Sequence, residues 1–364
     1  MRAYQIAVIK GDGIGPEVCE AAVEVTRRAL PEPRRLHFTE YRAGAEHYRK
    51  TGVAIPDETF EACRMADAIL HGAAGLPGVI YPDGTEAGVD FSLQLRFRLN
   101  LYANVRPIRL LPGVTSPLRR FAPGQIDYVI VRENTEGLYA ARGGGNILRD
   151  EVASDTILIT RRGTDRIVRF AFDLCRRRRG APRDGTHRVT ACHKANVLRA
   201  YAFFQRVFNE AAGNYPDVAP DHCYVDAMTA HLIERPDFYD VIVAENMFGD
   251  IISDLGAATV GGMGMSPSAE LGDEHGFFQA AHGSAPDIAG QNVANPIGTI
   301  LSGAMMLRWL GDRHGDPEAT RAAERIDRAV ETVLASGETR TRDLGGRAST
   351  TEVTAAVCKA LAGC

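Results

Sequence analysis

Two aspartates, Asp250 and Asp254, stand four residues apart in the otherwise apolar segment ENMFGDIISD. Helical spacing places them on one face, where like charges repel each other. Asp226, in YVDAM, adds a third carboxylate at the end of a strand-like run. Hard divalent cations such as Mg²⁺ and Mn²⁺ bind oxygen ligands, and an ion relieves the repulsion among clustered carboxylates. A helix-terminal charge for Asp250 and a surface position for Asp254 are the alternatives, but the apolar neighbours favour a metal site.

Arginines are frequent between residues 96 and 132. A guanidinium group binds a carboxylate through two parallel hydrogen bonds, so three arginines that converge on a cleft would suit a di- or tricarboxylate. Arg132 stands out because it ends an apolar, strand-like run, DYVIVR. A surface position is the alternative for each arginine taken singly. The members of the group are Arg96, Arg98, Arg106, Arg109 and Arg132.

Two residues are candidates for proton transfer. Lys194, in ACHKANVL, follows a strand-like run, and Tyr139 lies in EGLYA. A lysine in a desolvated cleft or near other cations has a lowered pKa, which suits a general base. An ordinary exposed lysine is the simpler interpretation from the sequence alone. The adjacent Cys192 and His193 have no partner at a spacing that would indicate a nucleophile.

Two loops are candidates for cofactor contact. Gly11–Glu17 reads GDGIGPE and fails as a dinucleotide fingerprint, because Pro16 occupies the position of the third glycine. A tight turn with proline near the start of the next helix is one interpretation, and a backbone wall against a cofactor is the other. The second loop, HGSAPDIAGQNVANP (282–296), has no regular period, and its length favours ligand binding over a simple connection.

The surrounding pattern is typical of an α/β protein. Strand-like runs such as YQIAVIK, AILHG, YVIVR, VTACH and YDVIVA each lead into a polar residue or a glycine-rich turn, and open α/β sheets bind ligands at those strand ends. Ser349 and Glu352 form a capping-box pattern ahead of the last helix. Helices are expected at 57–66, 163–179, 196–212, 296–311, 317–335 and 351–362, and after the first glycine loop.

Composition narrows the class of partner. The chain has 364 residues, 45% of them apolar, and a net charge of −4. It therefore offers no global attraction for nucleic acid or for an anionic membrane, and a small-molecule partner is expected. The one run of like charge, Arg176–Arg179, is interpreted as a solvated helix end, with a phosphate-binding patch as the alternative.

The cysteines and the hydropathy indicate a compartment. Seven cysteines are scattered without a CxxC pair, which predicts reduced thiols in a cytoplasmic protein and no zinc site. The apolar run at the N-terminus is too short for a secretory signal, and no stretch reaches the length of a transmembrane helix.

Taken together, these segments resemble the β-decarboxylating dehydrogenases, a family that includes isocitrate, homoisocitrate, 3-isopropylmalate and tartrate/D-malate dehydrogenases. The resemblance extends in order over nearly the whole chain. The segments that carry it are GDGIGPE, LYANVRP, VRENTEGLY, KANVL, VDAM, NMFGDIISDLGA, GGMGMSPSAELGD, HGSAPDIAG with ANP, and TRDLGG with TTEV.

The resemblance implies an isopropylmalate dehydrogenase-like fold, in which two α/β domains share a sheet, and not a Rossmann fold. A cofactor-binding domain would comprise 1–101 plus 261–364, and the second domain 102–260. A dimerisation arm is expected near 138–160, although the glycine run Gly143–Gly145 leaves its geometry open. Family members are homodimers or dimers of dimers with shared active sites.

The resemblance also implies roles for residues. Lys194 would act as the base toward the substrate hydroxyl, and Tyr139 as the proton donor to carbon after loss of CO₂. Lys194 and Asp226 would come from the neighbouring subunit. Arg96, Arg106 and Arg132 would hold the carboxylates of a 3-substituted malate, and Asp226, which also contacts the substrate, would bind Mg²⁺ or Mn²⁺ with Asp250 and Asp254.

The cofactor implied is NAD. NAD-dependent members have an acidic residue at the position of Asp287, whereas NADP-dependent members have lysine and tyrosine at the positions of Asp287 and Ile288. The acidic group would accept hydrogen bonds from the ribose hydroxyls. The other cofactor contacts implied are Ile14, His282, Gly283, Ser284, Ala285, Ile288 and Asn295.

In the family that the sequence resembles, the substituent on the third carbon of the substrate is read largely by the helix that leads to the position of Arg96. Ser92 can donate to an acidic group, which favours an isocitrate- or homoisocitrate-like substrate, D-malate or tartrate, or a phosphonate analogue. Asp90 disfavours an acidic group unless it pairs with Arg98. A 3-isopropylmalate dehydrogenase is the alternative, and a non-catalytic regulatory or binding subunit is an alternative of another class.

Overall fold

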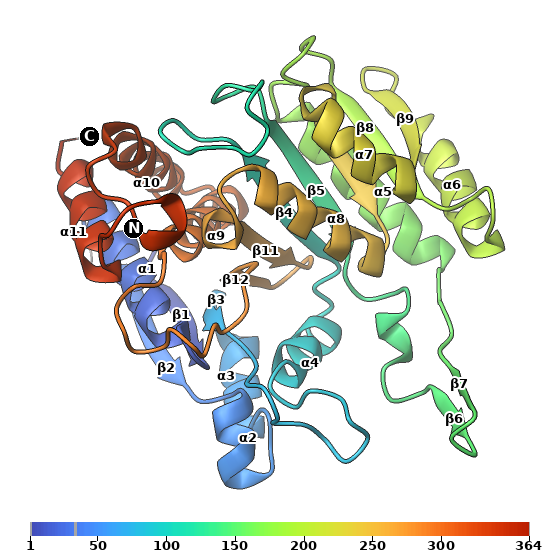
Figure 1. Cartoon of the computed structure of the whole chain (residues 1–364), viewed down its shortest axis with the longest axis horizontal. Coiled ribbons are helices and arrows are strands. Elements are labelled where there is room, and N and C mark those ends of the chain that lie inside the picture. The colour runs from blue at the N-terminus through green and yellow to red at the C-terminus, as the bar shows by residue number, and fades with distance from the viewer. Residues whose placement is uncertain (1, 33–34, 364) are drawn as a thin grey trace. The chain divides into compact units, whose positions relative to one another are not determined.

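The computed structural model describes residues 2–32 and 35–363, which divide into two compact units (Figure 1). The first unit comprises Met1–Leu101, Leu111–Thr115 and Gly261–Cys364, and the second Tyr102–Leu110 and Ser116–Val260. Each unit is a sheet covered by helices, so the predicted α/β class is confirmed. The cofactor and dimerisation roles assigned to the two parts remain predictions.

In the first unit the central strands are buried on both faces. The pairs β2/β1, β1/β3 and β3/β12 are parallel and β12/β11 is antiparallel. Phe60, Phe91 and Phe277 pack with Ile9 and Ile69 in one apolar cluster. In sheet order the strands are β2 (Leu36–Tyr41), β1 (Tyr4–Gly11), β3 (Ala68–Ala73), β12 (Gly276–Ala280) and β11 (Pro267–Leu271).

In the second unit four parallel strands end at one edge of the sheet. β5, β10, β8 and β9 are parallel neighbours, and β4 pairs with β5 in the antiparallel sense. The carboxyl ends of parallel strands share an edge, so the residues that follow these strands gather there. In sheet order the strands are β4 (Ala103–Arg109), β5 (Asp127–Glu133), β10 (Val241–Ala244), β8 (Arg188–His193) and β9 (Ala219–Tyr224).

The helices expected from the sequence are confirmed, with boundaries that differ by a few residues. They are α1 (Gly15–Ala29), α3 (Asp57–Met65), α5 (Arg161–Arg176), α6 (Arg199–Ala212), α9 (Ile297–His314), α10 (Pro317–Ser336) and α11 (Thr350–Leu361). The capping box of Ser349 and Glu352 is present at the start of α11. Further helices are α2 (Ala45–Thr51), α4 (Asp90–Arg98), α7 (Val225–Glu234) and α8 (Asn246–Thr259).

A two-stranded antiparallel ribbon lies within residues 138–160. It consists of β6 (Asn146–Leu148) and β7 (Val152–Ser154), all of whose residues are exposed. Figure 1 shows it extending away from the sheet of its own unit. Its apolar side chains, among them Ile147 and Leu148, are 71% and 60% exposed. The dimerisation role of this segment remains a prediction.

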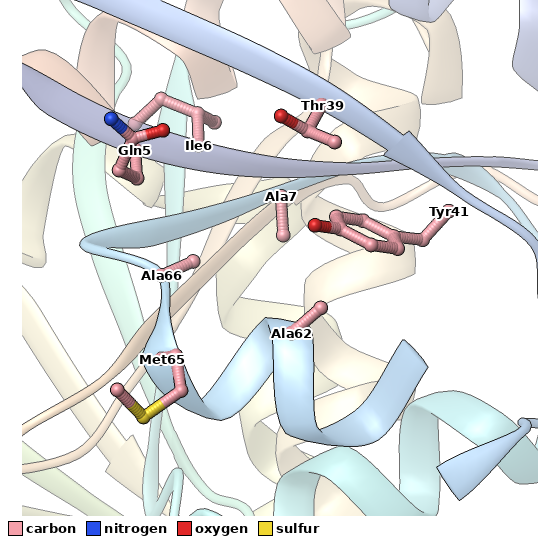
Figure 2. Close-up of a pocket in the computed structure, with 8 residues that line it drawn as sticks. All are labelled: Gln5, Ile6, Ala7, Thr39, Tyr41, Ala62, Met65 and Ala66. Carbon is pink, nitrogen blue, oxygen red and sulfur yellow. The ribbon is translucent and has the colours of Figure 1, made fainter. Parts of the chain in front are cut away.

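A pocket of about 210 Å³ lies beside β1, β2 and α3 in the first unit (Figure 2). It has no charged side chain in its lining, and no residue named above for chemistry takes part in it. Its lining residues are Gln5, Ile6, Ala7, Thr39, Tyr41, Ala62, Met65 and Ala66.

Among the helices of the described residues, none combines the length and the apolar character that a membrane span requires.

Helix α8 packs directly on the end of β5 because it has a glycine at the contact. A Cβ atom added at Gly249 would lie 2.7 Å from Cβ and 2.8 Å from Cγ of Arg132. Real Cβ atoms do not approach so closely, so any larger residue would move the helix away from the strand. Gly249 therefore sets the distance between α8 and Arg132.

We expect Gly249→Ala to lower the free energy of unfolding by about 1–2 kcal/mol, because overpacking outweighs the better helix propensity of alanine. Urea unfolding monitored by circular dichroism measures this. Gly213→Ala is the matched control, because its added Cβ would lie 3.4 Å from Glu210 O, its nearest neighbour, and its backbone is helical. Equal stability of the two variants would show that α8 does not depend on the close approach.

Candidate active site

Helix α8 presents its two aspartates to the arginines of β4 and β5. Arg132, near the end of β5, donates through Nη1 to Asp250 and through Nε to Asn246 Oδ1 at 2.9 Å. Arg106, in β4, places Nη2 3.2 Å from Asp250 Oδ1 and Nη1 3.3 Å from Asp254 Oδ1. The structure thus brings together four residues that the sequence marks for chemistry.

Tyr139 joins this group. It begins a short 3₁₀ helix, η2 (Tyr139–Ala141), and its hydroxyl donates to Asp250 Oδ2 at 3.0 Å. Its ring centre lies 5.3 Å from the guanidinium carbon of Arg132, a distance at which the cation and the ring attract each other. We call Arg106, Arg132, Tyr139, Asp250 and Asp254 the arginine–aspartate cluster.

The electrostatics of this cluster fit a divalent cation. Burial raises the pKa of Asp254, and the charge of Asp250 raises it further, while Arg106 and Arg132 act in the opposite direction. The two carboxylates therefore repel each other even with arginines beside them. An ion with hard-oxygen preference would relieve that repulsion, and the Asp254 side chain is 56% exposed and accessible to it.

Lys194 and Asp226 lie together just beyond two neighbouring strands, β8 and β9. Lys194 follows β8 directly, whereas Asp226 lies in the first turn of α7 and not at a strand end, because β9 stops at Tyr224. Lys194 Nζ donates to Asp226 Oδ1 at 2.5 Å, and this bond lowers the pKa of the Asp226 carboxyl. The Asp226 side chain is 68% exposed.

Asp226 is not assembled with Asp250 and Asp254 within one chain. In the described part of the chain, the one group of three potential metal ligands is Cys175, His187 and Asp240. In that group the buried Asp240 already accepts from Arg178 Nε at 2.6 Å and lies 3.1 Å from the Cys175 thiol, whose pKa burial raises. This second group is therefore explained by its own contacts.

Arg178 corrects one interpretation of the sequence. Arg176–Arg179 was expected to be a solvated helix end, and Arg176 does form an exposed pair with Asp217. Arg178, however, has a side chain only 17% exposed, and it bridges Asp127 and the buried Asp240. A buried carboxylate requires a counter-charge, which this arginine supplies.

In the first unit, Arg96 is held by Glu270, a residue that the sequence motifs do not indicate. Its Nε and Nη2 atoms donate to Glu270 Oε2 at 3.1 Å and Oε1 at 2.7 Å. Glu270 is completely buried in β11 and also accepts from Gln279 Nε2 at 3.0 Å. The available signal was a lone charged residue in the short strand PSAEL, since a buried carboxylate is normally paired.

The helix that leads to Arg96 places Ser92 differently from the expectation. The Ser92 hydroxyl donates to the carbonyl of Val89 at 2.8 Å, so its one proton is engaged within the helix. Asp90 accepts from Tyr81 Oη at 2.9 Å and from Gln94 Nε2 at 2.6 Å. These contacts weaken the argument that Ser92 donates to an acidic substituent.

The first glycine loop is a tight turn built around Asp12. The Asp12 carboxylate accepts from the backbone N–H groups of Ala45, Glu46 and Gly75, each at 2.9 Å. Pro16 stands at the start of α1, as the turn interpretation requires. Asp12 therefore joins the loop to the beginning of α2.

This turn lies against the second candidate loop. Ile14 donates its N–H to Ser284 O at 2.8 Å, and a Cβ at Gly13 would lie 2.0 Å from that same oxygen. Ile14 also belongs to an apolar cluster against which Ala285 and Ile288 pack. Two segments that the sequence assigns to one cofactor are thus neighbours within one unit.

The remaining residues of the second loop differ in whether they already form hydrogen bonds within the protein. Among the described residues, His282 Nε2 is buried without a hydrogen-bond partner, a feature that a ligand could satisfy. Gly283 and Asp287 are exposed. Asn295, in contrast, is buried and donates to Asp343 Oδ2 at 2.9 Å while accepting from the N–H of Ile297 at 3.0 Å. The set therefore fits a bound cofactor, with Asn295 partly engaged in the fold.

Comparison with known proteins identifies relatives over the whole chain. The sequence matches the family described as isocitrate/isopropylmalate dehydrogenase over residues 5–357. A 3-isopropylmalate/3-methylmalate dehydrogenase from Methanocaldococcus jannaschii is 44% identical over 98% of both chains. A 3-isopropylmalate dehydrogenase from Corynebacterium glutamicum is 42% identical over 98% of this chain and 99% of its own.

Solved structures agree in fold. An isocitrate dehydrogenase from Methylococcus capsulatus has a TM-score of 0.85 and 37% identity, over 98% of this chain and 99% of its own. A β-decarboxylating dehydrogenase from Thermococcus kodakarensis has a TM-score of 0.77 and 37% identity, over 99% of this chain and 96% of its own. The predicted family, fold type and enzyme class are confirmed, and the chain belongs to the isocitrate/isopropylmalate dehydrogenase family of β-decarboxylating dehydrogenases.

Proposed function

We propose that this protein catalyses the NAD-dependent oxidative decarboxylation of a 3-substituted malate to a 2-oxo acid and CO₂, with Mg²⁺ or Mn²⁺. The observation that carries the proposal is the arginine–aspartate cluster, in which two cations, two carboxylates and a phenol converge. Such a set can hold a polycarboxylate, bind a divalent ion and move a proton.

The arginines would bind and orient the substrate. Arg106 and Arg132 are almost completely buried and fixed by Ser253 and Asn246, so their guanidinium groups are preorganised. Arg96 is fixed in the same way by Glu270. Preorganised donors lose little entropy when a carboxylate arrives, which favours binding in one orientation.

Asp250 and Asp254 would hold the divalent ion, together with Asp226 of a neighbouring subunit. When bound, the ion would supply Lewis-acid chemistry and NAD would supply the hydride acceptor. Lys194, also from the neighbouring subunit, would take the proton of the substrate hydroxyl. Tyr139 would deliver a proton to carbon after CO₂ leaves, since its hydroxyl is directed at the cluster. The proposal therefore requires a homodimer or a dimer of dimers.

We expect Tyr139→Phe to lower kcat by about 10²–10⁴-fold with little change in KM, because a positioned proton donor contributes about that much. Steady-state NADH formation measures both constants. The ring of phenylalanine can still lie beside Arg132, so folding is retained. Tyr48→Phe, in the first unit, is the control. A fall in kcat no larger than that of the control would exclude Tyr139 as the donor.

For the substituent on the third carbon, a small alkyl group is the first candidate. The relatives described above carry the names 3-isopropylmalate and 3-methylmalate dehydrogenase. The engagement of the Ser92 proton within its helix supports the same choice. These findings favour the alternative reading over the acidic substituent preferred from the sequence. An acidic substituent is the second candidate, supported by the similarity to an isocitrate dehydrogenase.

We expect 3-isopropylmalate or 3-methylmalate to give the fastest NADH formation with Mn²⁺, and EDTA to abolish it. A panel that adds isocitrate, homoisocitrate, D-malate, tartrate and a phosphonate analogue measures this at the NADH absorbance band. Faster turnover of an acidic compound would reverse the order of the two candidates. Absence of metal-dependent turnover on every compound would favour a regulatory or binding subunit.

Asp287 supports NAD over NADP. Its exposed carboxylate lies in the loop beside Ile14, and it would accept from ribose hydroxyls and repel a 2′-phosphate. The reducing compartment expected from the sequence fits the six described cysteines, which are free thiols. The seventh, Cys364, lies outside the described residues. A cytoplasmic location is therefore part of the proposal.

We expect Asp287→Asn to lower kcat/KM for NAD about tenfold, because a hydrogen bond to a charged group is replaced by a neutral one. The ratio of kcat/KM for NAD to that for NADP measures the effect and should fall. Glu338→Gln, which removes an exposed charge elsewhere in the same unit, is the control. A wild-type preference for NADP would contradict the assignment.

A further inference from the structure

The imidazole of His193, the residue before Lys194, is completely buried. Both of its ring nitrogens have hydrogen-bond partners. Nδ1 lies 3.3 Å from the backbone nitrogen of Ala195, and Nε2 lies 3.2 Å from Nδ1 of His222. His222 Nε2 in turn lies 2.8 Å from Asn209 Oδ1. These contacts form a continuous chain from the loop of Lys194 to helix α6.

The direction of every hydrogen bond in this chain follows from its ends. A backbone N–H can only donate, so His193 Nδ1 accepts from Ala195, and a neutral His193 carries its proton on Nε2. That N–H donates to His222 Nδ1, which leaves the His222 proton on Nε2 to donate to Asn209. Burial lowers the pKa of His193 to about 4, so its ring is neutral at physiological pH, and partial desolvation also lowers the pKa of His222, although that residue is exposed.

The chain joins the two strands that carry Lys194 and Asp226. His193 is the last residue of β8, and it stands opposite Tyr224, the last residue of β9, in the parallel register. Lys194 follows β8 directly, and Asp226 lies two residues after β9, in the first turn of α7. The carbonyl of Lys194 also accepts from the N–H groups of Val197 and Leu198, each at 3.1 Å, so the lysine stands at a fixed turn.

We propose that His193 and His222 are positioning residues, which fix the loop of Lys194 against β9 and so set the spacing at which Lys194 and Asp226 enter the site of the neighbouring subunit. This inference rests on the proposed function, in which those two residues act together. Neither histidine touches the substrate. Their effect is exerted through the Ala195 amide and through the bond between the two rings.

Two substitutions at His222 separate this role from general stability. In His222→Asn the side-chain oxygen can take the place of Nδ1 and accept from His193. In His222→Leu an apolar side chain of similar size can pack on Phe208, whose ring lies 5.0 Å from that of His222, but it cannot accept. The buried N–H of His193 is then left without a partner, which favours rearrangement of the loop.

We expect His222→Leu to lower kcat about tenfold and to raise the Mn²⁺ concentration needed for half-maximal rate, with KM for NAD unchanged. His222→Asn should remain within about twofold of wild type, since it restores the acceptor. Thermal unfolding of each variant tests folding. Equal kinetics of the two variants, whether both impaired or both normal, would overturn the proposal.

A measurement independent of turnover keeps this inference distinct from the proposed function. In wild-type protein labelled with ¹⁵N-histidine, His193 should show the Nε2–H tautomer, and the Ala195 amide should exchange more slowly than in His222→Leu. An Nδ1–H tautomer would overturn the chain of hydrogen bonds. Failure of every malate as a substrate, with the Nε2–H tautomer observed, would instead reject the proposed function and leave the histidine chain intact.

Discussion

The pairing of buried arginines with acidic groups is the constraint on which the site depends. Arg132 is 2% exposed, and a charge so far from water is stable only with partners of opposite charge and full hydrogen bonding. Asp250 and Asn246 supply them from α8. Because α8 must approach β5 for these bonds to form, the helix has glycine at position 249. The requirements of charge burial thus determine the backbone packing.

The first unit solves the same problem with different residues. Arg96 is neutralised by Glu270, which is buried in β11 and held by Gln279. The carboxylate of Asp12 likewise binds three backbone N–H groups around the first glycine loop. In both units, polar groups are fixed by protein partners before any ligand arrives. In such a site the paired charges attract a ligand less strongly, but their positions are fixed more precisely.

Much of the fold follows from the sequence because its signals are local. The capping box at Ser349 and the proline at the start of α1 predict helix ends from a few residues. Asp250 and Asp254 are recognisable as a pair from helical spacing alone. Glu270 and Arg178 are not, because their partners are distant in the chain, and a single buried charge does not reveal what neutralises it. The hydrogen bond from the Ser92 hydroxyl to the Val89 carbonyl cannot be predicted from the residue types either.

Lys194 and Asp226 show what the sheet adds to the information in the sequence. Lys194 alone reads as an exposed lysine, and its salt bridge to Asp226 would be weak if both side chains were free to move. Two adjacent parallel strands remove much of that freedom, since the register places the ends of β8 and β9 side by side. The buried ring of His193 then fixes the backbone immediately after the strand. The strand register and the buried ring together give the pair of charges a defined position.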